Sequence, residues 1–198
     1  MKKIYIYGAS GHGLVVSDIA KACGYEEIIY IDDGVNDFPS FEEIKNQNDI
    51  PMAFGIGINT VRKKLFEKAV EYGFDVVTLV HPSAIVSDSV TLGLGTVVMP
   101  RVVVNAKSWV GNGVILNTSS VIEHENVIED FVHISPNVGL AGEVRVKECT
   151  HIGIGTNVIQ CLTIGSYCVV GAGSVVLKSI GDHRLCFGNP CKIMKELT

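Results

Sequence analysis

Every sixth residue from Val86 to Val176 is isoleucine, leucine or valine. Sixteen successive positions obey this rule without exception, which is far more than the aliphatic content of the chain would produce by chance. A period of six fits neither an α-helix nor an ordinary strand pair, but it fits a chain that turns a corner every six residues. The pattern therefore predicts a β-helix, a solenoid of short parallel strands, over residues 81 to about 176.

The positions around each aliphatic residue are restricted as well. Small side chains such as Thr96, Ser108 and Ser120 recur two residues before it, where the space inside a narrow solenoid is shortest. Gly, Asn, Ser, Ala or an acid often follows it directly, as at Gly93, Gly111 and Asn117, and these residue types favour tight turns. We therefore expect the corner to begin just after each aliphatic residue.

The first eighty residues follow a different pattern, which indicates a separate domain over residues 1–80 and a second one over residues 81–198. An apolar run over residues 4–7 leads into a glycine loop at residues 8–13 and then a helical pattern over residues 14–22, which predicts strand, loop and helix. Further strands are predicted over residues 28–31, 52–58 and 76–80. Asn59 is expected to cap a second helix that ends at Gly73, with an apolar face made of Val61, Leu65, Phe66, Ala69 and Val70.

The glycine loop has the spacing Gly-x-x-Gly-x-Gly and not the Gly-x-Gly-x-x-Gly of dinucleotide-binding folds. Amides at a helix N-terminus bind phosphate, so a nucleotide or nucleotide sugar is one interpretation, and a turn without a ligand is the other. Asp32 and Asp33 end the second strand about twenty residues further on, where a nucleotide-binding βαβ unit often places an acid. The unit is only half of a full dinucleotide fold, which argues against NAD as a hydride carrier.

Charge, hydropathy and cysteine content argue against several classes of function. The net charge is −5 and the charges are scattered, so no basic stripe favours nucleic acid or an acidic membrane. No signal peptide and no apolar stretch of membrane-spanning length is found. The six cysteines form no Cys-x-x-Cys pair, which favours reduced thiols and a cytoplasmic location.

Four segments carry a resemblance to a known family: the loop at residues 8–13, the pair Asp32-Asp33, the helix start at residues 59–64, and the His-Glu segment at residues 117–125. Together with the hexads, they make the chain resemble the hexapeptide-repeat sugar acetyltransferases. Within that family it is most similar to bacterial enzymes that acetylate the 4-amino group of a UDP-4-amino-4,6-dideoxy-N-acetylhexosamine, in the bacillosamine pathway of protein glycosylation. The resemblance implies a Rossmann-like nucleotide-sugar domain followed by a left-handed parallel β-helix with three hexads per coil.

The resemblance also implies roles for single residues. His124 would be the general base and Glu125 the group that raises its basicity. It further implies acetyl-CoA as co-substrate, no metal, a UDP-amino sugar as acceptor, and a homotrimer with active sites between neighbouring solenoids. Acetyl-CoA would be contacted by His133, Gly142, Ile154 and Ala172, and the nucleotide sugar by Ser10, Gly11, His12, Asp32, Asp33 and Gly57.

The residues support this interpretation independently, because positions 18 apart stack if one coil holds three hexads. His124 then lies beneath Gly142, with room for a developing oxyanion above the imidazole, and His133 lies beneath His151. Alternatives stay open: His124 could be a solvated surface residue, and the stacked histidines could ligate a metal. An O-acetyltransferase of a sialic-acid-like sugar and a non-catalytic nucleotide-sugar sensor are the other candidate functions. Trp109 is expected to face outward.

Overall fold

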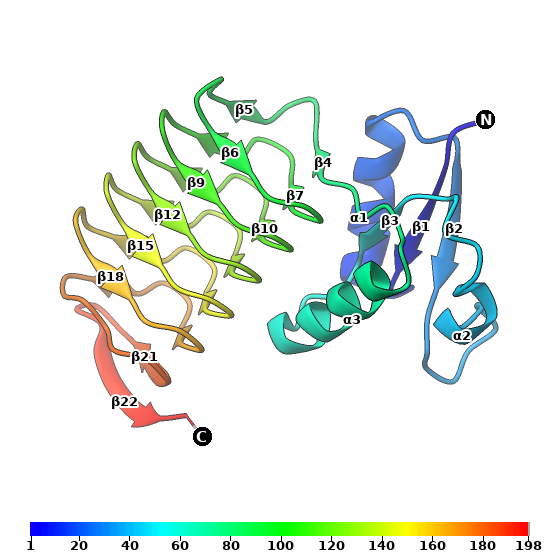
Figure 1. Cartoon of the computed structure of the whole chain (residues 1–198). Coiled ribbons are helices and arrows are strands. Elements are labelled where there is room, and N and C mark those ends of the chain that lie inside the picture. The colour runs from blue at the N-terminus through cyan, green and yellow to red at the C-terminus, as the bar shows by residue number, and fades with distance from the viewer. Residues whose placement is uncertain (198) are drawn as a thin grey trace.

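A computed structural model describes residues 1–197. The chain folds into a small α/β unit at its N-terminus and a long β-solenoid, with helix α3 lying between the small sheet and the coils (Figure 1). One continuous apolar core joins the two parts, since Ile4, Val16 and Ile19 of the first belong to the same buried cluster as Leu79 and Val97 of the second.

The N-terminal unit contains a three-stranded parallel sheet in the order β2-β1-β3. Strand β1 is buried along most of its length, and the glycine loop connects it to the first helix, as the sequence predicts. A short helix that the sequence analysis missed starts after Ser40, whose side chain and backbone both bond the Glu43 carboxylate in a capping box. The elements are β1 (Lys3–Tyr7), α1 (His12–Ala22), β2 (Glu27–Ile31), α2 (Phe41–Ile44), β3 (Met52–Phe54) and α3 (Asn59–Glu71).

Two predictions for this unit are wrong in detail. Asn59 is the first residue of α3 and does not cap it, because its side chain turns away and bonds two carbonyls of the solenoid. The segment 76–80 is not one strand of the N-terminal sheet. Val76 makes a single bridge to Met52, whereas β4 (Leu79–Val80) pairs with a solenoid strand.

The solenoid of about six turns, of the left-handed β-helix type, confirms the prediction from the hexads. Each coil contributes one two-residue strand to each of three flat sheets, which we call faces I, II and III, and strands 18 residues apart pair in parallel, as in Ile115 with His133. Face I holds β4, β7 (Val97–Val98), β10 (Ile115–Leu116), β13 (His133–Ile134), β16 (His151–Ile152), β19 (Val169–Val170), β21 (Arg184–Phe187) and β22 (Lys192–Glu196). Face II holds β5 (Ile85–Val86), β8 (Val103–Val104), β11 (Val121–Ile122), β14 (Gly139–Leu140), β17 (Asn157–Val158) and β20 (Val175–Val176). Face III holds β6 (Thr91–Leu92), β9 (Trp109–Val110), β12 (Val127–Ile128), β15 (Arg145–Val146) and β18 (Thr163–Ile164).

The repeating aliphatic residues form the core of the solenoid. All of them are buried from Val98 to Val176, and only Val86 and Leu92 of the first coil are half-buried. The small residue two positions earlier also points inward, and its hydroxyl satisfies a carbonyl of the next coil, as in Thr96 Oγ1 to Gly111 O (2.8 Å). A hydroxyl is therefore useful at this position because it fills little space and pairs a buried carbonyl.

The corners are built differently from the expectation. A left-handed residue, with φ between 55° and 69°, occurs three positions after each aliphatic residue from Leu92 to Val170 and not directly after it. Most of these residues are not glycine, although the conformation is unfavourable for other side chains. From Gly113 to Gly173, each corner is held by a backbone hydrogen bond from this residue to the coil before, as in Glu143 N–H to His124 O (3.0 Å). The left-handed residues are Gly95, Arg101, Lys107, Gly113, Ser119, Glu125, Phe131, Asn137, Glu143, Cys149, Gly155, Cys161, Tyr167 and Gly173.

Candidate active site

His124 lies on the corner between faces II and III, in the segment that joins β11 to β12. The next residue, Glu125, is the left-handed corner residue, so the two side chains leave the corner together. His124 Nδ1 is 3.2 Å from Glu125 Oε2, and both side chains are about half exposed (55% and 47%). The predicted His-Glu pair is therefore formed, and it faces open solvent in the single chain.

Gly142 lies directly over the imidazole, as the 18-residue spacing predicts. A Cβ atom at position 142 would be 2.5 Å from His124 Cε1 and 2.6 Å from Nε2, so only glycine leaves room for the ring in this place. Within residues 1–197, the Gly142 N–H has no backbone hydrogen-bond partner, while the N–H groups on either side of it are bonded. The corner that packs over His124 therefore carries an amide without a backbone partner.

Asn126, which the sequence analysis did not single out, supports this corner from inside. It is fully buried, and its Nδ2 donates to Glu123 O (2.6 Å) and Ala141 O (3.0 Å). These carbonyls belong to the corners that carry His124 and Gly142. The one signal for it in the sequence is that it is the single asparagine among the inward positions two residues before the aliphatic ones.

The glycine loop is shaped by two close backbone approaches. A Cβ at Gly13 would be 1.9 Å from Gly8 O, and one at Gly55 would be 2.5 Å from Gly13 Cα, so the loop and the end of β3 need glycine to pack. Gly11 has φ 33° and no neighbour within 4 Å, and it precedes α1 without a side-chain cap. Ser10 and Gly11 therefore lie at an accessible helix N-terminus, an arrangement that suits an anion.

Asp32 and Asp33 line a hollow of about 240 Å³ beside this loop, together with Gly8 and Ile56. Asp32 accepts hydrogen bonds from the N–H groups of Ala9 (3.0 Å) and Gly34 (2.9 Å), which lower its pKa. Asp33 instead accepts from the Tyr7 hydroxyl and the Phe41 N–H at the start of α2. The two carboxylates thus have different partners: Asp32 accepts from the glycine loop, and Asp33 accepts from the first residue of α2.

The structure brings together three histidines that are far apart in the sequence. His12 of the glycine loop lies 6.2 Å from His133 on face I, and His133 stacks on His151 at 4.6 Å, measured between ring centroids. Burial is the largest cause that lowers the pKa of His12 to about 4 and of His133 to about 3, and it also lowers the pKa of His151. The charge of Arg62 acts in the same direction on all three. These rings are therefore neutral at pH 7.

The remaining predicted residues lie on different edges of the solenoid. Gly57 and His133 line a hollow of about 520 Å³ between the start of α3 and face I. Ile154 and Ala172 are exposed and stack on the corner between faces I and II, where Gly173 N–H bonds Ile154 O (2.8 Å). Gly142 is on the other corner of face II. The predicted acetyl-CoA residues are thus not contiguous within one chain.

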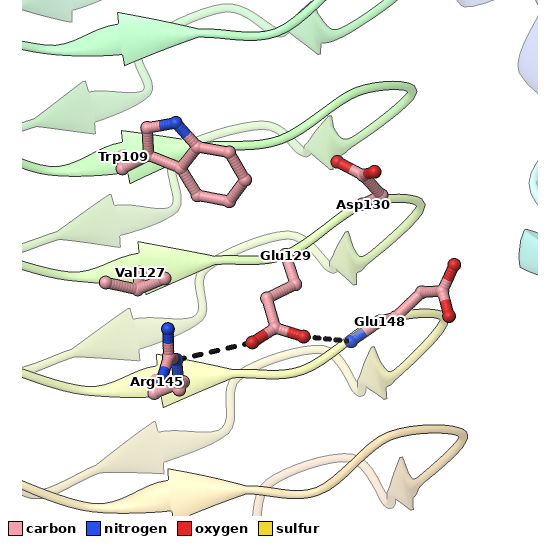
Figure 2. Close-up of a pocket in the computed structure, with 6 residues that line it drawn as sticks. All are labelled: Trp109, Val127, Glu129, Asp130, Arg145 and Glu148. Atoms are coloured by element: carbon pink, nitrogen blue, oxygen red, sulfur yellow. Dashed lines mark hydrogen bonds and ion pairs between the residues drawn. The ribbon is translucent and has the colours of Figure 1, made fainter.

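A further hollow of about 570 Å³ lies on face III and contains none of the predicted residues (Figure 2). Trp109, Val127 and Arg145 come from three successive strands, and Glu129 bridges Arg145 (3.3 Å) and the Glu148 N–H (3.2 Å). The indole of Trp109 is 42% exposed, as expected for an outward position. This hollow has no histidine among its lining residues, whereas the corner that carries His124 has an imidazole and a carboxylate side by side.

Clusters of metal-ligating side chains are absent from residues 1–197. In this part of the chain, no group of three or more His, Cys, Asp or Glu side chains could hold a metal ion, and Nε2 of His151 lies 2.8 Å from the Ser135 hydroxyl. Among the described helices, none is long and apolar enough to cross a bilayer.

Comparisons with known proteins show which proteins share this fold and sequence. The family described as the PglD N-terminal domain matches residues 3–69. The structure of PerB from Caulobacter crescentus in complex with CoA and GDP-perosamine is 37% identical, with a TM-score of 0.93, and the match covers 98% of this chain and 97% of that one. The acetyltransferase domain of PglB from Neisseria gonorrhoeae FA1090 in complex with acetyl coenzyme A is 38% identical, with a TM-score of 0.92 and coverage of 98% and 99%. The UDP-N-acetylbacillosamine N-acetyltransferase of Bacillus subtilis is 36% identical over 114 residues, 50% of this chain and 52% of that protein.

The coiled hexads define the class of left-handed β-helix proteins. With two solved relatives above 35% identity that match along almost their whole length, the chain belongs to the hexapeptide-repeat sugar acetyltransferases.

Proposed function

We propose that this chain is an acetyl-CoA-dependent N-acetyltransferase that acetylates the 4-amino group of a UDP-4-amino-4,6-dideoxy-N-acetylhexosamine, in the bacillosamine route to protein glycosylation. The observation that carries the proposal is the corner where His124, Glu125 and the free Gly142 N–H meet. The name of the Bacillus subtilis relative, a UDP-N-acetylbacillosamine N-acetyltransferase, supports a UDP-linked acceptor. The Caulobacter structure contains GDP-perosamine, so a GDP-linked amino sugar is the alternative acceptor to test. A cytoplasmic location fits an enzyme that uses acetyl-CoA.

In the proposed mechanism the amine attacks the thioester directly. The amine attacks in its neutral form and its nitrogen becomes positively charged as the C–N bond forms, so a base must take a proton from it. A neutral imidazole can accept this proton and pass it on to the departing thiolate. With Nδ1 directed at the Glu125 carboxylate, His124 Nε2 is left to accept that proton. The Gly142 N–H faces the oxyanion of the tetrahedral intermediate, which collapses by breaking the C–S bond and releases CoA as the thiol once protonated.

The N-terminal unit supplies the nucleotide-sugar half of the site in this proposal. We propose a Rossmann-like domain over residues 1–80, followed by the acyltransferase domain over residues 81–198. Ser10, Gly11 and His12 at the start of α1 are suited to the diphosphate, because the helix N-terminus is open and uncapped. Asp32, Asp33 and Gly57 line the hollows on either side of Ile56.

We further propose that the active site forms between chains of a homotrimer. The N-terminal unit packs over face I, where His12 meets His133, whereas His124 lies on the II–III corner. In a triangular coil that corner is opposite face I, so the base and the sugar half-site of one chain point away from each other. A neighbouring solenoid would bring its own II–III corner to this chain's face I. Acetyl-CoA would then lie between the chains, along face II, with Gly142 on one of its corners and Ile154 and Ala172 on the other.

The test of the activity is mass spectrometry of products formed from acetyl-CoA and a panel of UDP- and GDP-linked 4-amino sugars, with free and sialic-acid-like sugars as O-acetylation controls. We expect one added acetyl group on a nucleotide 4-amino sugar. His124→Ala should lower kcat by about a hundredfold or more, and Glu125→Gln by less. An O-acetylated product, or an active His124→Ala variant, would overturn the proposal.

Subunit complementation tests the shared site. His124→Ala and Asp32→Ala trimers should each be poorly active at low sugar concentration, but chains mixed at random after denaturation and refolding should recover about a quarter of the sites, because each site takes one half from each neighbour. A site contained within one chain predicts no recovery.

A further inference from the structure

Arg62 is the largest fully buried side chain in the described part of the protein, at 1% exposure. It lies in the first turn of α3, between the N-terminal unit and the solenoid. Buried arginines are normally paired with a carboxylate, since an unpaired charge is costly to remove from water. Within residues 1–197, the hydrogen-bond partners of this guanidinium are all neutral oxygens, and burial lowers its pKa to about 10. Such a costly arrangement needs a reason.

The solenoid side of this contact consists of corner carbonyls. Arg62 Nε donates to Gly113 O (2.7 Å), and Nη2 donates to Phe131 O (2.9 Å). Gly113 and Phe131 are the left-handed residues of two successive coils, 18 residues apart, on the corner between faces III and I. Nη2 also reaches Asn59 Oδ1 (2.9 Å), and Asn59 Nδ2 donates to Cys149 O (3.0 Å), which is the equivalent corner of the third coil. The two side chains therefore fix α3 to three consecutive coils.

The other side of the same guanidinium holds the loop after β3. Nη1 donates to Ile56 O (2.9 Å) and Gly57 O (3.2 Å). Ile56 lines the hollow with Asp32, and the backbone of Gly57 lies beside the His133 ring on face I. One rigid, planar group thus sets the distance between this loop and the solenoid, a role that lysine with its single nitrogen could fill only in part.

We propose that Arg62 is a positioning residue for acetyl transfer, which holds the loop of Ile56 and Gly57, and with it the nucleotide-sugar half-site, in a fixed place over face I. This inference rests on the proposed function for its kinetic consequence, but its structural part stands on the hydrogen bonds alone. Arg62 touches no reacting atom in this scheme, and it acts through the loop that it holds.

The chain offers a matched control at the next residue. Lys63 is on the same helix and crosses the same interface, with Nζ 2.7 Å from Glu148 Oε1, but it makes no hydrogen bond to the loop. Lys63→Met removes an interdomain ion pair and leaves the loop contacts intact, whereas Arg62→Met removes both the interdomain contacts and the loop contacts of residue 62. Arg62→Lys keeps the charge and one donor group.

The kinetic arm measures KM for the nucleotide sugar and for acetyl-CoA separately. We expect Arg62→Met to raise the sugar KM about tenfold or more and to leave the acetyl-CoA KM within about twofold, with Arg62→Lys in between and Lys63→Met like wild type. A purely structural role would lower the active fraction, and so kcat, without this split. An unchanged sugar KM in Arg62→Met, or an equal rise in both KM values, would overturn the proposal.

The second arm needs no activity and uses hydrogen exchange on the intact protein. Two hydrogen bonds flank the loop: Gly55 N–H to Tyr7 O (2.8 Å) and residue 62 N–H to Ile58 O (2.9 Å). Both amides should exchange faster in the Arg62 variants and as in wild type in Lys63→Met, while Met99 N–H in the solenoid stays protected in all of them. Unchanged exchange at the two flanking amides would refute the positioning role.

If wild type acetylated no nucleotide sugar, the proposed function would fail, and the hydrogen-exchange experiment would still decide the role of Arg62. If Arg62→Met failed to fold, Arg62→Lys would decide both arms by the same criteria.

Discussion

The neutral histidines between the two parts of the molecule predict a loss of stability in mild acid. Burial, assisted by the charge of Arg62, lowers the pKa of His12 to about 4. Burial, with the neighbouring His151 next in importance, lowers the pKa of His133 to about 3. In the unfolded chain each imidazole has its ordinary pKa of about 6.5. The unfolded state therefore binds more protons between these limits, so stability is fully present above about pH 6.5 and is lost as the pH falls toward 4.

The size of the loss follows from the same values. At about pH 5 an unfolded imidazole is 1.5 pH units below its pKa and protonated, while the folded one is still neutral, which corresponds to about 2 kcal/mol. His12 and His133 together should cost about 4 kcal/mol between pH 8 and pH 5, a large part of a typical unfolding free energy. For a chain of this length that is a fall in Tm of about 8 to 16 °C. Asp32 adds little in this window, because its lowered pKa places its titration at lower pH.

The assay is urea or thermal unfolding at about pH 8, 6.5 and 5, followed by two probes. Far-UV circular dichroism follows α1 and α3 in the N-terminal unit, and fluorescence follows Trp109, the single tryptophan, in the solenoid. His12→Asn and His133→Asn should each remove about half of the pH dependence, since an amide does not titrate. His183→Asn, at an exposed position, is the control and should leave it unchanged. A wild-type stability that is flat from pH 8 to 5, or variants with the wild-type slope, would refute the reasoning.

Four further substitutions test individual contacts. Gly142→Ala places a Cβ 2.5 Å from the His124 ring, which is exposed and can swing away, so we expect normal assembly with kcat lowered about tenfold or more in acetyl-transfer assays. Asp32→Ala should raise KM for the nucleotide sugar and not for acetyl-CoA, whereas Asp33→Ala should cost about 1–3 kcal/mol in thermal unfolding, because it leaves Tyr7 and α2 without their acceptor. Ile134→Ala, at a fully buried position of β13, should cost about 2–5 kcal/mol in urea unfolding followed by Trp109 fluorescence.

Matched controls separate these effects from general damage. Gly181→Ala adds a Cβ where nothing lies within 4 Å and should keep wild-type kcat. Val169→Ala removes an apolar side chain from the outer side of face I, where it is 37% exposed, and should cost far less than Ile134→Ala. A fully active Gly142→Ala variant would show that acetyl transfer does not depend on the position that the His124 ring has in this structure. Equal costs at Val169 and Ile134 would contradict the assignment of inward and outward positions.

The solenoid was predictable because its contacts repeat. Each aliphatic residue packs against equivalent residues 18 positions earlier and later in the chain. All sixteen positions therefore show the same preference, and the repeat can be recognised in the sequence. The same arithmetic places Gly142 over His124 and His151 beside His133 from the sequence alone. The corner conformation escaped prediction, because residues such as Arg101, Glu125 and Phe131 show no preference for a left-handed backbone. The N–H of each of them donates to an oxygen of the coil before, so the acceptor is far away in the sequence.

The interface between the two parts could not be predicted, because it depends on contacts between distant segments. Arg62 is 51 residues from Gly113 and 69 from Phe131, and its partners are backbone carbonyls, which leave no trace in side-chain identity. The predicted apolar face of α3 is right only in part, since Phe66 and Ala69 are buried but Val61 and Val70 are exposed. The polar residues Asn59 and Arg62 are buried in their place. His12 was expected at the nucleotide sugar, and only the fold shows that it also reaches the histidines of face I.

The separation of the two half-sites explains why the solenoid must be rigid. His124 is held by a corner whose carbonyl bonds the next coil and whose inner space is filled by Asn126, so its place is set by the stack and not by the N-terminal unit. The proposed sugar half-site lies beside the loop that Arg62 holds, on a different corner of the same stack. If a neighbouring chain completes each site, the reacting atoms meet only when both corners keep their register, and an error of about 1 Å at either corner is enough to lower the rate severely. The costly burial of Arg62 is then understandable, because it ties the sugar half of the site to the same rigid coils that carry the base.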